Sequence, residues 1–526
     1  MHFGTTAPTV TSALQGVIAV TALQAMVRMT HWDFTLYVTG SAGLIIGLLL
    51  IVTYRGRTVS GWIKHRRRYR RRPSQLAQLI SSDDTAILWD HSRRLISILI
   101  EVTSKPFALN ILDQTHEWSS RTVDLDLVRA ELRQYDIPLH DITTTTIGYT
   151  YADQGALARV AFNTTGPINA ITRGHTYLRV TLELEQASAS IEAREIDSFA
   201  DPRDSLTSGI ARTIQIASAR AHRAVTLQGF IARKLSRDEA TGLHREFVAL
   251  LGAEALTQEG STHAGKSAPH LVGFTPAPKH DNEKTRSEWL RATTDVCATI
   301  TRIAPVADNE DRIEQFYCNK VRRLDSVSLA EANQLRREYG QHAAIAVTAL
   351  PLAVPPELTA TPGRVVHVED SCGVRLKPGG VGIYLGHSAS GNERVWLDIT
   401  VSCAEPLWLF GPLEAAQLFL IRSASLGLRI DSRPADLAPL AHALRHSGVG
   451  AHDESDLTIG SLGDEVKSAA PVRITWSTAL NKQLPRYYID ATTAGVLKVH
   501  TPDDQMEVRW ELNSAEAALL AESVAR

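Results

Sequence analysis

Two uncharged segments near the N-terminus, with a run of basic residues after them, constrain this sequence most. Residues 36–54 are nineteen consecutive residues without Asp, Glu, Lys or Arg. As an α-helix rising about 1.5 Å per residue, this segment is roughly 28 Å long, close to the ~30 Å hydrocarbon core of a bilayer. Residues 9–27 are equally uncharged but contain Gln15 and Gln24. The pattern predicts transmembrane helices at 9–27 and 36–54, joined by an extracytoplasmic loop at 28–35.

The basic run over residues 55–74 predicts how the hairpin is oriented. Its nine cations, called the basic collar below, are Arg55, Arg57, Lys64, Arg66, Arg67, Arg68, Arg70, Arg71 and Arg72. Positively charged segments stay on the cytoplasmic side, so both termini, including the tail at 1–8, are expected inside the cell. The collar is also expected to bind anionic membrane lipids, at about 1 kcal/mol per cation. The other interpretation is that these cations only fix the membrane topology. The two roles are compatible.

A secretory signal peptide and a buried core helix are the alternatives to this hairpin. A signal peptide needs an early positive region, and only Met1 and His2 could supply that charge here. A core helix fits less well, because Trp32 and Tyr37 flank one end of the second segment and Tyr54 and Trp62 the other, as aromatic residues do at membrane interfaces.

Small or amide-bearing residues share one face of each predicted membrane helix. They are Ser12, Gln15 and Gly16 on the first helix and Gly40, Gly43 and Gly47 on the second. Small residues let helix backbones approach closely in lipid, and an amide at mid-bilayer depth favours a protein partner. These faces are therefore expected to pack, either on each other or on another subunit.

Outside the collar the chain is acidic and typical of a globular protein. The formal net charge is −2, so the residues other than the nine collar cations sum to −11. This acidity argues against nucleic acid as a partner. Hydrophobic residues make up 44% and charged residues 21%, enough for a sizeable core. The four cysteines form no C-x-x-C pair and are expected to be buried thiols.

The pattern after the collar predicts an α/β (α+β) cytosolic region of two related domains, 75–256 and 285–526. Between them, 257–284 is rich in Gly, Ser, His, Pro and Lys and is predicted to be a linker. Expected strands include 95–102, 139–151, 177–185, 345–350, 364–368, 381–385 and 394–401; expected helices include 123–135, 204–251 and 413–425. In 177–185 the alternation predicts Leu178 and Val180 facing the core and Arg179 and Thr181 facing solvent.

A repeated helix-start motif indicates that the two domains are related. Residues 236–247 read SRDEATGLHREF and residues 328–339 read SLAEANQLRREY. Both open with a capping box, S-x-x-E, and share spacing through the final aromatic residue. Two independent helix starts are the alternative explanation.

One short motif matches a nucleotide-binding signature. Residues 260–267 fit G-x-x-x-x-G-K-[ST], with Lys266 at the lysine position. A functional P-loop follows a buried strand and opens a helix, whereas the preceding residues are polar and Pro269 comes shortly after. We expect this match to be accidental.

Other patterns are also weak. Asp124 and Asp126 could form a metal-binding Asp-x-Asp pair but lie at a predicted helix start, where acidic residues favour the helix dipole. Residues 386–390 fall short of the nucleophile elbow G-x-S-x-G, and no histidine or cysteine spacing fits zinc. No catalytic residue, cofactor or metal is therefore predicted.

Several stretches resemble EccE, the membrane-complex component of actinobacterial type VII (ESX) secretion. They are the two N-terminal hydrophobic segments, the collar ending in RRRP, ILWDHSRRLISILIEV at 87–102, LVRAELRQYDIPLHDITT at 127–144, GVGIYL at 380–385, and 422–437 with its RIDSRPADL. The resemblance spans most of the chain and rests on order and spacing. It implies a non-enzymatic subunit of the cell membrane that assembles with EccB, EccC and EccD, of which EccC is the ATPase. The alternative hypothesis is a membrane-tethered enzyme, nucleotide-binding or glycosyltransferase-like, with its active site in the cytosolic region.

Overall fold

The computed structural model describes residues 76–525 with short breaks, together with three short strands nearer the N-terminus. The breaks are residues 83, 113–116, 119–121, 151–155, 167, 169, 196–201, 261, 277–295, 323, 325–334, 357, 359, 360, 362, 445–454, 462–469 and 482. The three strands pair in the order β1 (Phe3–Thr5), β2 (Val52–Tyr54) and β3 (Arg57–Thr58).

Most of the predicted membrane hairpin lies outside the described residues. At its end the structure differs from the prediction, because Val52–Tyr54 form strand β2 instead of the last turn of a helix. β-branched and aromatic residues such as these favour extended backbone. Among the described residues, no helix is long and apolar enough to cross a membrane.

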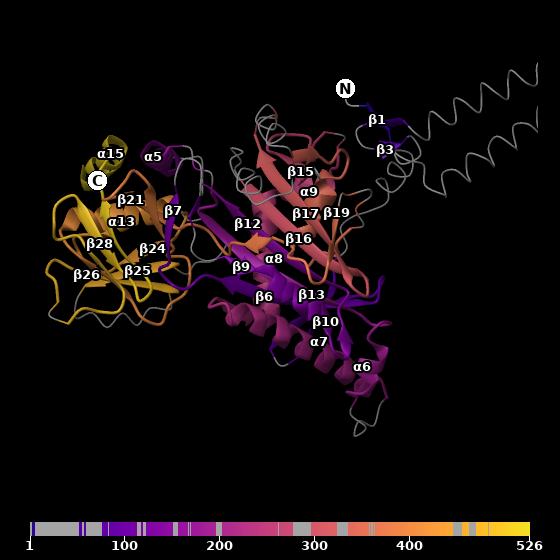
Figure 1. The fold of residues 1–526 in the computed structure, drawn as a ribbon. Helices are drawn as coiled ribbons and strands as arrows, with labels where there is room; N and C mark the ends of the chain where they lie inside the picture. Colours follow the sequence, from indigo (N-terminus) through magenta and orange to yellow (C-terminus); the bar gives the residue numbers. More distant parts are fainter. Residues whose placement is uncertain are drawn as a thin grey trace, which may run out of the picture.

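The first sheet has eleven strands, and all its pairings are antiparallel (Figure 1). Its order is β18-β15-β17-β16-β12-β13-β6-β5-β4, with β14 beside β6 and β19 beside β17. The strands are β4 (Gln78–Ser82), β5 (Thr85–Asp90), β6 (Leu95–Thr103), β12 (Asp141–Tyr149), β13 (Arg173–Glu183), β14 (Ile231–Lys234), β15 (His270–Pro276), β16 (Val296–Ala307), β17 (Glu310–Val321), β18 (Leu335–Arg337) and β19 (Gly363–His367).

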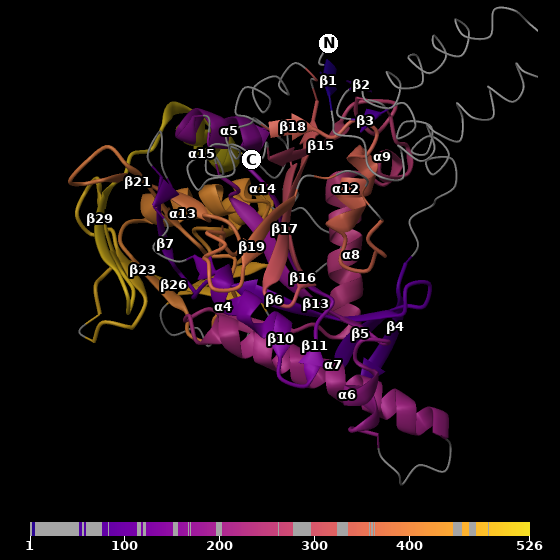
Figure 2. The ribbon, with the colours of Figure 1, turned by 45° about the vertical axis from the view of Figure 1, so that its right-hand side comes forward.

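Helices cover both faces of this sheet (Figures 1 and 2). Helix α7 (Pro202–Thr226) packs on one face, where Ile214 and Ala217 join a core with Ile98 of β6. Helices α8 (Arg237–Leu251), α9 (Ala253–Thr257) and α12 (His342–Thr348) cover the other, where Phe247 and Ile345 pack with Leu99. Shorter elements flank the α7 side: α4 (Leu125–Arg129), a 3₁₀ turn (Ala130–Leu132) and α6 (Ser188–Glu192).

This double cover corrects one sequence prediction. Leu178 and Val180 face the core as expected. Arg179 and Thr181, expected in solvent, are each only 4% exposed. Alternation identifies the two faces of a strand, but the second face is exposed to solvent only when no other element packs on it. Here the elements after residue 235 cover it.

The second sheet also has eleven strands and mixes parallel with antiparallel pairing. Its order is β24-β25-β26-β23-β27-β28-β29-β21-β22-β7-β8, and the pairs from β24 to β27 are parallel. The strands are β7 (Leu109–Leu112), β8 (Glu117–Trp118), β21 (Ile383–Ser388), β22 (Arg394–Leu397), β23 (Leu407–Phe410), β24 (Ile430–Ser432), β25 (Leu457–Ser461), β26 (Val472–Ser477), β27 (Tyr488–Asp490), β28 (Val496–His500) and β29 (Gln505–Arg509). Helices α5 (Ala156–Thr165), α13 (Leu413–Ser425), α14 (Ala438–Leu444) and α15 (Ser514–Ala525) accompany this sheet.

Each of the two sheets contains strands from both halves of the sequence. Strand β7, from the first half of the sequence, pairs with β22 in the second sheet. Two small ladders join further segments: β9 (Val123–Asp124) with β20 (Arg375–Leu376), and β10 (Arg133–Gln134) with β11 (Ile137–Pro138). The predicted linker at 257–284 contains the buried strand β15, and β16, β17 and β19 complete the first sheet beyond it. A boundary at this segment therefore does not separate the sheets.

The repeated helix-start motif has different outcomes in its two copies. Ser236 and Glu239 form the predicted capping box at the start of α8. In the second copy, Leu335–Arg337 form strand β18 instead of helix. The strand predicted at 345–350 is also wrong, since most of it belongs to α12. A short apolar run such as AAIAV fits a buried helix as well as a buried strand, and periodicity does not separate them.

Candidate functional site

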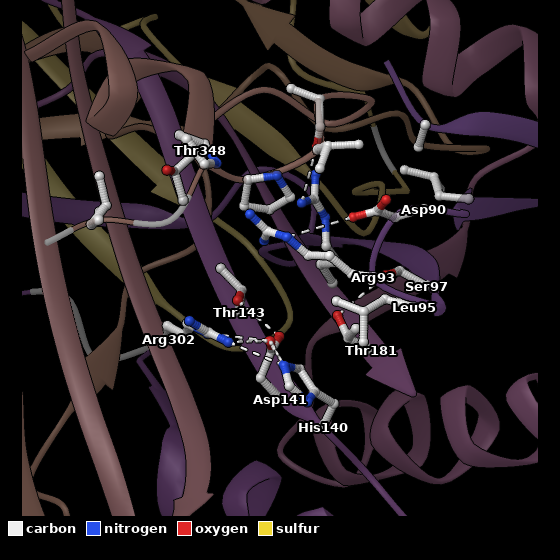
Figure 3. A pocket seen from close by; sticks show the side chains of 18 of the residues that line it. Asp90, Arg93, Leu95, Ser97, His140, Asp141, Thr143, Thr181, Arg302 and Thr348 are labelled. Atoms are coloured by element: carbon white, nitrogen blue, oxygen red, sulfur yellow. Dashed lines mark hydrogen bonds and ion pairs between the residues drawn. The ribbon is translucent and has the colours of Figure 1, made fainter. Parts of the chain in front are cut away.

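A cavity of about 380 Å³, lined by both polar and apolar side chains, lies on the α8 side of the first sheet (Figure 3). Strands β5, β6, β12, β13, β16 and β17 contribute to its walls. A segment at 348–356, called the strap below, contributes Thr348 and the run from Ala353 to Pro356. Arg93, His140 and Arg302 are 29–37% exposed, so solvent reaches the cavity.

The strand register brings hydroxyl groups to one side of this cavity. Antiparallel pairing sets Ser97 of β6 opposite Thr181 of β13, and the Ser97 hydroxyl donates to Thr181 Oγ1 at 3.2 Å. Thr143 of β12 donates to Asp141 Oδ1, also at 3.2 Å. Figure 3 shows these side chains on neighbouring strands. Because their partners lie within the sheet, the hydroxyls can be buried without an unmet hydrogen bond.

Each of the four carboxylates that line the cavity lies within ion-pair distance of a basic side chain. The Asp141 carboxylate lies 3.0 Å from the Arg302 guanidinium group, and the Glu314 carboxylate lies 3.8 Å from the same group. Glu183 lies 3.4 Å from His140. Glu314 is also paired from outside the cavity lining, by Arg312 at 3.1 Å. Arg302 and Arg312 therefore balance the charges of Asp141 and Glu314.

The remaining charged groups are less completely paired. Arg179 donates to the backbone carbonyls of Leu350, Pro351 and Ala353, all in the strap, and its Nε has no hydrogen-bond partner among the described residues. Asp90 Oδ2 is likewise buried without a hydrogen-bond partner in the described part of the chain. The Nε of Arg93 lies 3.9 Å from that oxygen, an ion pair too long for a hydrogen bond.

A second charged cluster joins α8 to the sheet. His175 Nδ1 lies 3.6 Å from Glu101, and its Nε2 lies 3.5 Å from Glu246. Burial opposes the charged imidazolium, but the two carboxylates overcome that effect and raise the pKa of His175 to about 9. Arg233 adds a bridge of 2.6 Å to Glu101. The cluster ties β6, β13, β14 and α8 together at neutral pH.

Lys377 lies where the two sheets meet. Burial lowers the pKa of its ammonium group to about 7, against the attraction of Asp398. The Asp398 carboxylate accepts a hydrogen bond from the Ser104 hydroxyl at 2.6 Å and another from the backbone N–H of Thr400, so it has several hydrogen-bond partners. Among the described residues, no group of three or more His, Cys, Asp or Glu side chains could hold a metal ion.

The P-loop-like segment has the wrong surroundings for binding phosphate. Helix α9 precedes it and strand β15 follows it, the reverse of the strand–loop–helix order that a P-loop needs. Ala264 and Leu271 exchange two backbone hydrogen bonds, of 2.8 and 3.1 Å, which fold the segment back on β15. Just before it, the Glu259 carboxylate accepts the N–H groups of His342 and Ala343 at 2.8 Å.

The Asp-x-Asp pair caps a helix, as the dipole argument predicts. Asp124 is the N-cap of α4 and accepts from Asp126 N–H at 2.9 Å. Asp126 in turn accepts from the Cys372 N–H at 2.7 Å. Gly386, in the nucleophile-elbow-like stretch, lies at an irregularity in the β21–β22 ladder.

The residues singled out from the sequence do not form the cavity. Ser12, Gln15, Gly16, Gly40, Gly43 and Gly47 lie outside the described residues. So does the basic collar, except Arg57, whose backbone is in β3. The cavity residues were missed because Arg179 has the position of a solvent-facing residue in an alternating strand. The cluster of Asp90 and Arg93 at the turn after β5 was the one available signal.

Comparison with models of known protein families finds no match for this chain, and comparison with curated proteins finds none either.

Proposed function

We propose that this chain is a structural, non-enzymatic subunit of a type VII (ESX) protein secretion complex in the cell membrane. A two-helix hairpin with both termini in the cytoplasm would anchor it, and the large region after the collar would contact EccB, EccC and EccD. The observation that carries the proposal is the order of features that resemble EccE: two uncharged segments, a collar ending in RRRP, and four matching stretches.

Two of the four matching stretches contribute a buried arginine to the fold. Arg129, from the stretch at 127–144, bonds Asp311 at 2.6 Å where Asp311 is fully buried. Arg422, from the stretch at 422–437, bonds Glu516 at 2.9 Å and the carbonyl of Leu385 at 2.8 Å. Buried charges tolerate little substitution, because losing one partner leaves the other unpaired.

The alternative of a nucleotide-binding enzyme loses its main sequence argument. Its lysine would be Lys266, but the loop around Lys266 lies between a helix and a strand in the wrong order. The structural role therefore accounts for more of the sequence than the enzymatic one does.

The two functions are separated by replacing Lys266 with Ala in the full chain. The structural proposal expects unchanged secretion at unchanged protein level, and no difference in ATP binding between variant and wild type. Loss of secretion together with loss of ATP binding, at equal protein level, would overturn the proposal in favour of the enzyme.

A further inference from the structure

Strand β19 (Gly363–His367) has one unpaired edge in the part of the chain that the structure describes. It lies beside β17 (Figure 1), and no other described strand pairs with it. The Val368 N–H, just after the strand, donates to the carbonyl of Asn309 at 2.9 Å. Hydrogen-bonded pairs alternate along an antiparallel ladder. The backbone groups of Val366 therefore point toward β17, whereas those of Val365 point away from it.

The outward backbone groups of β19 are accessible. The carbonyl of His367, which points the same way as that of Val365, accepts a hydrogen bond from Arg129 at 2.5 Å. The N–H and C=O of Val365 have no hydrogen-bond partner among the described residues, and Val365 is 52% exposed. Unpaired N–H and C=O groups along a strand edge are a template for one more strand.

Exposed valines lie beside this edge. Val365 is joined by Val368, which is 40% exposed, and by Val306 at the end of β16, which is 57% exposed. The hydrogen bond between Val368 and Asn309 links β19 to the turn that follows Val306. Neighbouring exposed apolar side chains favour a contact with another polypeptide, because an added strand would cover them.

Four exposed carboxylates make this end of the sheet negative. Two lie in or next to the β16–β17 turn and two follow β19: Asp308, Glu310, Glu369 and Asp370. None of the four side chains has an ion pair within the described ranges. The nearest arginines are paired elsewhere, since Arg129 and Arg133 bond Asp311 and Arg312 pairs with Glu314. The uncompensated charge therefore favours lysine or arginine in a partner.

We propose that the open edge of β19 binds an extended, basic segment of a partner polypeptide, which adds to the first sheet as one more strand. Backbone hydrogen bonds to Val365 would supply affinity, and the four carboxylates would select Lys or Arg side chains. An anionic membrane surface does not fit, because the same carboxylates repel it and lipid provides no strand. The site goes beyond the proposed function and does not depend on it.

The test measures binding of short fluorescent peptides to the full chain, purified in a neutral detergent, by fluorescence anisotropy. The probe alternates Lys with Val. A Glu–Val peptide of equal length tests the charge, and a Lys–Pro peptide keeps the charge but loses half of its N–H donors. The Lys–Val peptide is expected to bind at least about tenfold more tightly than either control. If it does not bind, or if either control binds as tightly, the proposal is wrong.

Variants of the strand locate the site. Val365→Pro removes an N–H that points away from β17, and proline is tolerated at such an edge position. We expect this variant to bind the Lys–Val peptide at least about tenfold more weakly, with an unchanged unfolding midpoint. The control is Val365→Thr, which keeps the N–H and the β-branched shape and should bind as wild type does. Equal binding by Val365→Pro and wild type would overturn the proposal.

A charge variant keeps the test decisive if Val365→Pro does not fold. Glu310→Gln with Glu369→Gln leaves the backbone unchanged and removes two exposed carboxylates, so the Lys–Val peptide should bind several-fold more weakly. Unchanged binding by this double variant would contradict the proposed selection for basic segments.

A second copy of this chain is the other possible occupant of an open edge. Sedimentation of wild type and Val365→Pro without peptide distinguishes it. The proposal expects the same oligomeric state for both chains. A wild-type dimer that Val365→Pro converts to a monomer would show that β19 pairs with its own copy, and the proposed basic partner would be wrong.

Discussion

His175 stays charged because two carboxylates flank a partly buried imidazole. Its pKa is raised from 6.5 to about 9 by Glu101 and Glu246, after burial has acted in the opposite direction. A raised pKa in the folded state stabilises the fold below the unfolded pKa, and that stabilisation is lost as pH rises toward 9. His175→Gln removes this linkage.

We therefore expect the free energy of unfolding of wild type, relative to His175→Gln, to fall by on the order of 2 kcal/mol between pH 6 and pH 10. Denaturant titrations of both chains at several pH values measure the difference. Lys377, whose pKa is lowered to about 7, titrates in the same window with the opposite sign, but it is common to both chains and cancels. A difference that does not change with pH would show that His175 is neutral.

Asp311 is a buried acid that pairs with two arginines. It is fully buried and bonds Arg129 at 2.6 Å and Arg133 at 2.7 Å. Asp311→Asn removes the carboxylate that the two guanidinium groups share and leaves Arg129 only Asp126, at 3.3 Å, so we expect a loss of about 3 kcal/mol in unfolding free energy. The control is Glu185→Gln, in an ion pair whose side chains are both more than 60% exposed, which should cost under about 1 kcal/mol. Equal effects of the two substitutions would contradict this account of the pair.

Helix α12 begins at a carboxylate supplied by another segment. Glu259 accepts N–H groups of His342, Ala343 and Ala344, the donors that a helix start leaves unpaired. Glu259→Ala should lower the unfolding free energy by about 1–2 kcal/mol. Lys266→Ala, seven positions along the same segment, should change it by less than about 0.5 kcal/mol. Denaturant unfolding compares them, and a larger effect of Lys266 would mean that this lysine has a structural or binding role.

Elements whose pattern reflects local chemistry were predictable. The helix expected at 413–425 matches α13 (Leu413–Ser425), and the Ser236 capping box is present at α8. Elements decided by long-range packing were not. Strand β15 lies in a segment whose composition predicts a linker. It is a strand because it pairs with β17 and β18. Arg179 was expected in solvent because only tertiary structure shows that the strap covers its face.

The mixed α/β character of the chain follows from its sequence patterns, but the division into two related halves does not describe the sheets. Strand β7 crosses to the second sheet and β15 to β19 return to the first, so the early and late segments depend on each other. A pattern read along the sequence contains no information on such exchanges, because strand pairing is set by packing between distant residues. The cavity shares this dependence, since its walls come from both sides of residue 257.

The predicted glycine face concerns how the whole molecule associates in the membrane. Gly43→Leu with Gly47→Leu adds bulk where helix backbones are expected to meet, and lipid supplies little hydrophobic drive to compensate. Insertion should be unaffected because leucine is more apolar than glycine. We expect the double variant to remain in the membrane fraction while its recovery with the complex falls several-fold, measured by quantitative co-purification. Full recovery would mean that this face is turned toward lipid.

The most direct test of the account is purification of the tagged full chain from its native membrane after gentle extraction, with mass spectrometry of what accompanies it. A structural subunit of a type VII complex is expected to bring EccB, EccC and EccD in a constant ratio that an untagged strain does not yield. Recovery of the intact chain alone, while those three proteins stay together in a separate assembled fraction, would contradict the proposed function.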